Sequence, residues 1–164
     1  MSTLRTGTQI VAICGLAMFA GVILTVARTL VPYWQSLSAK AFLGAFAQFN
    51  HLVPAAVAPV LLPTLLAVLG SVLLTWRSPR SRLFWLLAGA CLLLVLALTA
   101  LYFSPLNSAF AEQRVPTNEV AFRLHWWARI HSLRVALSTA APILGLLAFA
   151  SEQGSADDPQ TKSG

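Results

Sequence analysis

The sequence predicts an all-α fold: an integral membrane four-helix bundle with an interfacial amphipathic helix between its first two spans. Of its 164 residues, 57% are hydrophobic and 10% are charged, which is too much apolar surface for a soluble domain of this size. Four apolar stretches are each long enough, at roughly 20 residues, to cross a hydrocarbon core of about 30 Å. We place these spans at residues 9–30, 52–74, 84–103 and 130–150 of a transmembrane domain that covers residues 1–150.

The first span has one feature of a secretory signal, because Arg5 precedes its apolar run. The run is longer than the roughly 7–15 apolar residues of a signal and is followed by no small-x-small cleavage site. We therefore expect this helix to be retained in the protein.

The orientation is predicted from the short connection between the second and third spans, which contains Arg77, Arg80 and Arg82. Positive residues in short loops stay on the cytoplasmic side of a membrane. The opposite side also carries basic residues, so the charge count alone does not decide the orientation. The arginine-rich hairpin favours an N-in, C-in topology in a bacterial-type inner (cytoplasmic) membrane.

An amphipathic helix is predicted between the first two spans. Pro32 is expected to end the first helix, and residues 36–50 then place four apolar side chains at i, i+3, i+4 and i+7 spacing. These side chains are Phe42, Ala45, Phe46 and Phe49. Such a helix is expected to lie at the membrane interface.

Asn50 and His51 follow this helix, where the second span enters the membrane. That span contains Pro54, Pro59 and Pro63, and a proline inside a helix frees a backbone carbonyl and can bend the axis. A bent second span could open a cavity, although packing strain is the commoner explanation of such prolines.

The fourth helix is expected to begin well before the membrane. Pro105 and Asn107 are predicted to stop the third helix, and Thr117 is a suitable N-cap for the fourth. Along this helix one face carries a stripe of mostly polar residues: Arg123, Trp127, His131, Arg134 and Ser138. Charged side chains at the edge of the hydrocarbon are costly and persist mainly where they are used, so this stripe is the candidate functional site.

Several classes of function are not indicated. The basic residues flank the spans and form no run interleaved with aromatics, which favours contact with lipid head groups over nucleic acid. Cys14 and Cys91 lie in spans and suggest no disulfide framework. No phosphate loop, nucleophile elbow, HExxH motif or pair of carboxylates is present, so the common hydrolases are set aside.

The polar tail, residues 151–164, is expected to be disordered.

Four membrane helices and three short motifs together resemble the anthrone oxygenase family over about residues 8–150. The motifs are a Phe-rich segment ending in Asn50, Pro-x-Asn at Pro105 to Asn107, and Trp-x3-His-x2-Arg at Trp127 to Arg134. The resemblance implies oxidation of an anthrone to an anthraquinone by molecular oxygen, with no cofactor other than O2 as co-substrate. Family membership alone does not establish the substrate, because one fold can host different reactions.

The chemistry of this reaction assigns three candidate catalytic residues. An anthrone has an acidic methylene group, whose deprotonation gives an electron-rich enolate that can reduce oxygen directly. His131 is the expected base, because imidazole exchanges protons near neutral pH. Arg134 is expected to stabilise the enolate oxyanion, and His51 is a candidate second base or proton carrier.

Three more residues are candidates for binding the substrate. Trp127 could stack on the ring system, and Asn50 and Asn107 could hold phenol or carbonyl oxygens by hydrogen bonds. Structural alternatives stay open: Trp127 could serve packing, Asn107 could cap the turn after Pro105, and Arg134 could extend toward the head groups. The expected partners are membrane lipids and a hydrophobic aromatic small molecule, and the sequence indicates no oligomeric state.

Two rival functions remain at this stage. His51 and His131 are expected at similar depth, so they could ligate a haem or a copper ion between the second and fourth helices. Two histidines with no further ligand make a sparse site, and we expect no metal. The chain could also be a non-catalytic accessory membrane protein in which the stripe serves helix packing.

Overall fold

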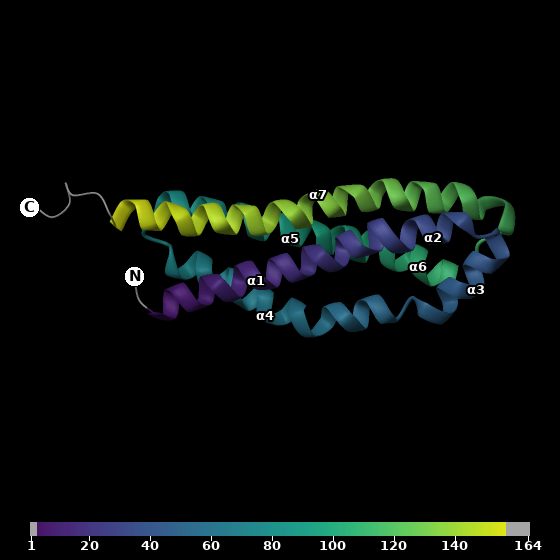
Figure 1. Ribbon diagram of the computed structural model, residues 1–164, viewed down its shortest axis with the longest axis horizontal. Helices are drawn as coiled ribbons and strands as arrows, with labels where there is room; N and C mark the ends of the chain where they lie inside the picture. The colour runs from purple at the N-terminus through teal and green to yellow at the C-terminus, as the bar shows by residue number, and fades with distance from the viewer. Residues whose placement is uncertain (1–2, 157–164) are drawn as a thin grey trace, which may run out of the picture.

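The chain forms an elongated bundle of long helices in the computed structural model (Figure 1). The structure describes residues 3–156, and side chains as far as residue 153. In chain order its elements are α1 (Thr3–Thr25), the π-helical segment η1 (Val26–Leu30), α2 (Val31–Ser36), α3 (Ala39–Phe49), α4 (Leu52–Leu74), α5 (Pro79–Leu98), the π-helical segment η2 (Thr99–Phe103), α6 (Ser104–Ala111) and α7 (Thr117–Ala156).

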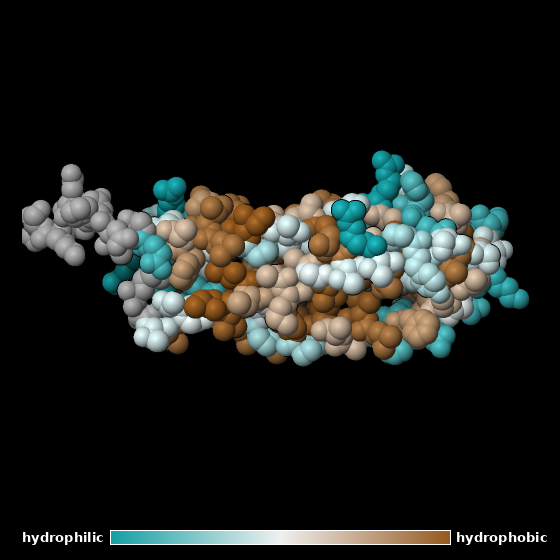
Figure 2. All heavy atoms as spheres, viewed as in Figure 1, coloured by the Kyte–Doolittle hydropathy of each residue, from teal (hydrophilic) through white to brown (hydrophobic). Residues whose placement is uncertain are grey.

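Four continuous helical stretches are long and apolar enough to cross a membrane. They are Thr3–Ser36, Leu52–Leu74, Pro79–Ala111 and Thr117–Gln153. Brown, hydrophobic residues cover much of the middle of the molecule, whereas teal, hydrophilic residues gather mainly toward its two ends (Figure 2). These observations confirm the predicted all-α four-helix membrane bundle.

The core of the bundle lies where α1, α4, α5 and α7 meet. α7 packs along α5 and α1, and α1 packs along α4. Trp85 is the largest fully buried side chain of this core and packs with Leu16, Leu92 and Val95. Gly15 brings α1 very close to α4, because a Cβ atom at this position would collide with the side chain of Thr64.

Pro32 and Pro105 do not end helices, contrary to the prediction. Each follows a π-helical segment, in which the Val31 N–H donates to the Val26 carbonyl and the Ser104 N–H donates to the Thr99 carbonyl. A proline ring crowds the carbonyl four residues earlier and lacks an N–H, and a wider turn relieves both problems. The first and third membrane helices therefore continue beyond the predicted spans.

The helix predicted between the first two spans is confirmed as α3, which lies across the end of the bundle where α2 and α6 also lie (Figure 1). Ser38 caps it, since its hydroxyl accepts a hydrogen bond from the Ala41 N–H. Phe42 and Phe46 are buried against Phe110 of α6. α3 therefore closes this end of the bundle over an aromatic cluster.

At the opposite end, α7 continues through residues predicted to be a disordered tail. The helix extends to Ala156, and Glu152 is buried. Its Oε1 lies 2.7 Å from Nη2 of Arg5, accepts a hydrogen bond from Gln9 Nε2 at 3.0 Å and accepts another from the Ser81 hydroxyl. These donors from α1 and α5 hold the end of the helix in place, which corrects the prediction for residues 151–156. Residues 157–164 lie outside the described part of the chain.

Replacing Glu152 with alanine should lower the free energy of unfolding in detergent by about 3 kcal/mol, because it leaves buried donors and a cation without their acceptor. Glu112→Ala is the matched control. Glu112 pairs with Arg114 at the exposed surface, where an ion pair contributes about 0–1 kcal/mol. Equal losses of stability in the two variants would show that the Glu152 cluster does not hold the bundle together.

Candidate functional site

A cavity of about 480 Å³ lies between the helices near the end that α3 closes. Its walls come from α1, α3, α4, α5 and α7 and from the segments between them, and most of the lining side chains are apolar. Aromatic rings are prominent, among them Trp34, Phe46 and Phe103. The volume falls within the roughly 300–1,000 Å³ of typical small-molecule sites, which combine apolar walls with a few polar groups.

One face of α7 supplies the polar part of this cavity. Trp127, His131 and Arg134 follow one another at i, i+4 and i+7 and all three line it. The rings of Trp127 and His131 are stacked, with centroids 4.7 Å apart and an interplanar angle of 21°. The Arg134 guanidinium carbon lies 4.3 Å from the centroid of the Phe103 ring. Packing against aromatic rings thus positions both the imidazole and the guanidinium group.

The hydrogen bond of His131 determines which of its nitrogens is free. Its Nε2 lies 3.1 Å from the backbone carbonyl oxygen of Ile23 in α1. Because a carbonyl oxygen can only accept, Nε2 must carry the hydrogen, and the neutral ring then has its lone pair on Nδ1. Nδ1 is buried and has no hydrogen-bond partner in the described part of the chain. The ring is therefore held in the tautomer that presents Nδ1 as a proton acceptor.

Arg134 offers a complementary group. Its Nε is buried and makes no hydrogen bond to any residue that the structure describes. A buried donor without an acceptor is costly, and the guanidinium remains positively charged at all ordinary pH values. The arrangement favours binding of a negatively polarised oxygen beside Arg134, one helical turn from the imidazole of His131.

Asn107 and Asn50 also line the cavity, from α6 and from the end of α3. The Asn107 Oδ1 accepts a hydrogen bond of 2.8 Å from Trp127 Nε1, which fixes the indole beside His131. The Asn50 Nδ2 donates to the Ala47 carbonyl at 3.3 Å. The structure therefore brings Asn50, Asn107, Trp127, His131 and Arg134 together around one cavity.

His51 is not part of this group. It is exposed at the start of α4 and does not line the cavity. Arg123, at one end of the predicted stripe, is exposed and pairs with Glu119 at 2.7 Å. Ser138, at the other end, donates its hydroxyl hydrogen to the Val135 carbonyl. The part of the stripe that faces the cavity is thus limited to residues 127–134.

Sequence reasoning missed the groups from other helices that complete the site. The Ile23 carbonyl could not be identified, because every residue carries one. Phe103 and Trp34 gave only a weak signal, as aromatic residues two positions away from Pro105 and Pro32. Their proximity to Trp127 depends on the helices continuing through both prolines.

Metal ligands do not gather at the cavity. Within residues 3–156, no three residues of the types His, Cys, Asp and Glu come together as a metal site would require. His131 lines the cavity, whereas His51, its proposed co-ligand, does not.

Comparison with known proteins gives one positive result. A family model described as anthrone oxygenase matches residues 42–144, more than half of the chain, which include most of α3, all of α4 and the face of α7 that lines the cavity. No curated protein and no solved structure matched. The extent of the family match shows that the chain belongs to the anthrone oxygenase family.

Proposed function

We propose that the protein is a membrane-embedded, cofactor-independent oxygenase that oxidises an anthrone or another electron-rich polycyclic aromatic compound. One observation carries the proposal: His131, whose buried Nδ1 has no partner among the described residues, lines an apolar cavity together with Arg134, whose buried Nε also has none. A base, a cation and an apolar slot are the groups that this reaction needs from a protein. Family membership supports the same reaction class.

The first step is removal of a proton from the methylene carbon of the anthrone. Nδ1 of His131 accepts this proton, and the electron pair of the broken C–H bond moves into the ring system to form an enolate. The negative charge develops on the oxygen at the opposite side of the central ring. Arg134 stabilises that oxygen, and its effect is large because the surroundings are apolar.

The second step joins oxygen to the former methylene carbon. The enolate transfers one electron to O2, and the resulting radical pair combines to form a C–O bond. The imidazolium of His131 returns its proton to the peroxide. Loss of the remaining hydrogen from the same carbon breaks the O–O bond and gives the quinone carbonyl and water. One O2 is consumed for each anthrone, and both atoms are accounted for, one in the quinone and one in water.

The walls of the cavity suit a flat apolar molecule. Trp127, Phe103 and Trp34 offer ring faces and edges to an aromatic ligand. Asn50 and Asn107, which also line the cavity, would bond the oxygens at its periphery. The open cavity is the feature that favours this function over an accessory protein, for which a solidly filled bundle would be expected. The haem or copper alternative has no comparable support, because His51 lies outside the cavity.

Purified protein in lipid vesicles should convert an anthrone such as emodin anthrone to its quinone with no added flavin, haem or metal. Oxygen consumption and quinone absorbance should rise together, with one O2 used per quinone. Protein-free vesicles measure the spontaneous reaction. A rate no higher than in those vesicles would show that the protein lacks the proposed activity.

We also propose the N-in, C-in orientation, in which the candidate site lies in the outer half of the membrane. The connection between α4 and α5 lies at the same end of the bundle as the N- and C-terminal ends of the described chain (Figure 1), where Arg5 donates a hydrogen bond to Ser78. This connection and the first turn of α5 contain Arg77, Arg80 and Arg82. In a variant with both native cysteines replaced, a cysteine at Pro79 should react with an impermeant reagent only from the cytoplasmic side. A cysteine at the exposed Ser108 should react only from outside. The reverse labelling pattern would place the site near the cytoplasm.

A further inference from the structure

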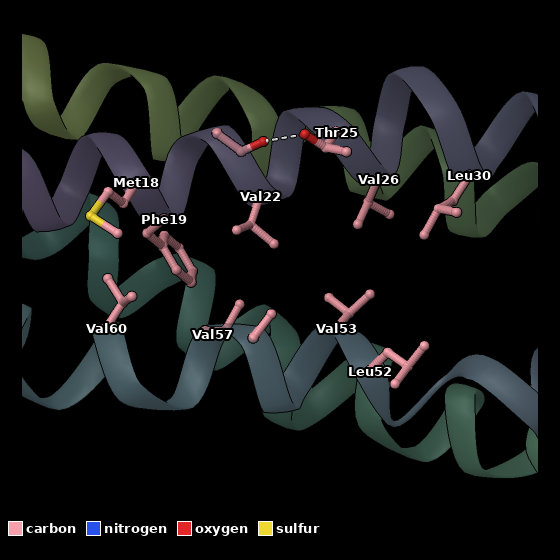
Figure 3. Close-up of a pocket in the computed structure, with 12 residues that line it drawn as sticks. Met18, Phe19, Val22, Thr25, Val26, Leu30, Leu52, Val53, Val57 and Val60 are labelled. Atoms are coloured by element: carbon pink, nitrogen blue, oxygen red, sulfur yellow. Dashed lines mark hydrogen bonds between the residues drawn. The ribbon is translucent and has the colours of Figure 1, made fainter.

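A second hollow adjoins the candidate site. It is a groove of about 490 Å³ between α1 with η1 and the first half of α4, as Figure 3 shows. In that view Val22 and Val26 point toward Val53 and Val57 across the groove. The groove and the site cavity share six lining residues: Phe19, Val26, Leu30, Leu52, Val53 and Val57. The two hollows therefore adjoin along these side chains.

The groove exists because α1 and α4 are in close contact over only part of their length. They meet tightly at Gly15 and Thr64, and the buried residues of α4 all lie from Thr64 onward. The preceding half of α4 contains Pro59 and Pro63 inside the helix, where prolines favour bending. The two helices separate toward the end that α3 closes (Figure 1).

The surface of the groove is suited to hydrocarbon. Its lining is almost wholly apolar, and Met18 and Leu52 are more than half exposed at its edges. The Thr25 hydroxyl donates to the Gly21 carbonyl at 2.8 Å, so this polar group is already satisfied (Figure 3). No other polar side chain of the described lining is available to bind water, so lipid chains can fill the groove.

We propose that this groove is a lateral access route through which the aromatic substrate passes from the bilayer hydrocarbon into the candidate site. The inference rests on the proposed function for the identity of the ligand. A polycyclic aromatic molecule partitions into hydrocarbon because its apolar surface leaves water. Access from the side brings such a ligand to His131 and Arg134 with its apolar surface covered throughout.

Two glycines of α1 provide a matched test. An added Cβ at Gly21 or at Gly7 meets no other atom within 4 Å, so both positions tolerate a larger side chain. Gly21 lines the groove but not the site cavity, whereas Gly7 lines neither. Gly21→Phe should therefore obstruct the route without altering the site, and Gly7→Phe should do neither.

The experiment measures binding and turnover in lipid vesicles. The probe is emodin, an anthraquinone, whose association is followed by quenching of tryptophan fluorescence. Gly21→Phe should slow association about tenfold, within the one to three decades over which association rates vary among variants of one site. It should lower kcat/KM for emodin anthrone while kcat is retained, and Gly7→Phe should behave like the unmodified protein.

The outcomes separate this inference from the proposed function. Slower probe binding in Gly21→Phe with no turnover in any variant would support the route and overturn the oxygenase activity. Turnover with equal association rates in both glycine variants would overturn the route alone. The route would also be overturned if Gly21→Phe lost a lipid chain that the unmodified protein binds, with no change in the association rate. Absence of probe binding to the unmodified protein would also overturn the route.

Discussion

Replacing His131 with alanine should reduce the rate of anthrone oxidation by about 100-fold to 10,000-fold, the usual effect of losing a positioned general base. The loss is expected because His131 lines the cavity and its buried Nδ1 is left as the proton acceptor by the bond from Nε2 to the Ile23 carbonyl. The measurement is the oxygen-consumption rate in vesicles after subtraction of the spontaneous reaction.

His125→Ala is the control for this variant. His125 lies on the same helix but is exposed and outside the cavity, so its replacement should leave the rate unchanged. His51→Ala tests the earlier assignment of a second base, and its exposed position predicts no loss. If His131→Ala oxidised the anthrone as fast as the unmodified protein, the base would have to be another group.

Arg134→Ala should lower kcat by about 100-fold to 1,000-fold, as removal of one donor to a developing oxyanion does in other enzymes. The guanidinium group is positioned over the Phe103 ring, and its buried Nε has no partner among the described residues. Arg134→Lys should recover only part of the activity, because an ammonium group cannot reproduce the planar donors of a guanidinium.

Arg129→Ala is the matched control for Arg134→Ala. Arg129 lies on an exposed face of α7, with its guanidinium carbon 5.4 Å from the centroid of the Trp126 ring. Its replacement removes the same charge outside the cavity. Equal kcat values for the two alanine variants would mean that the effect comes from net charge and not from a cation at the reaction centre.

Much of the candidate site could be predicted because it lies on one helix. Trp127, His131 and Arg134 share a face of α7 by helical periodicity alone. Asn50 follows α3 and Asn107 lies within α6, and these two helices pack against each other. The position of His51 could not be predicted from its depth. A shift of one residue in where a helix begins changes whether a side chain faces the bundle or its surroundings, and His51 is exposed.

The remaining differences arise from interactions that are distant in sequence. A proline such as Pro32 or Pro105 can either end a helix or follow a widened turn. In this structure both follow a widened turn, and the helix that continues past Pro32 packs Trp34 against Trp127 of α7. Glu152 looked like part of a polar tail, but its donors Gln9 and Ser81 lie 143 and 71 residues away in the chain. No local pattern reports such a pairing.

Removal of a proton from the bound anthrone by His131 is the step on which the proposed reaction depends, and it can be measured without oxygen. Under anaerobic conditions in D2O, the protein should catalyse exchange of deuterium into the methylene group of the anthrone, as followed by mass spectrometry. His131→Ala should exchange no faster than protein-free vesicles, whereas His125→Ala should match the unmodified protein. Equal exchange rates for the unmodified protein and His131→Ala would contradict the claim.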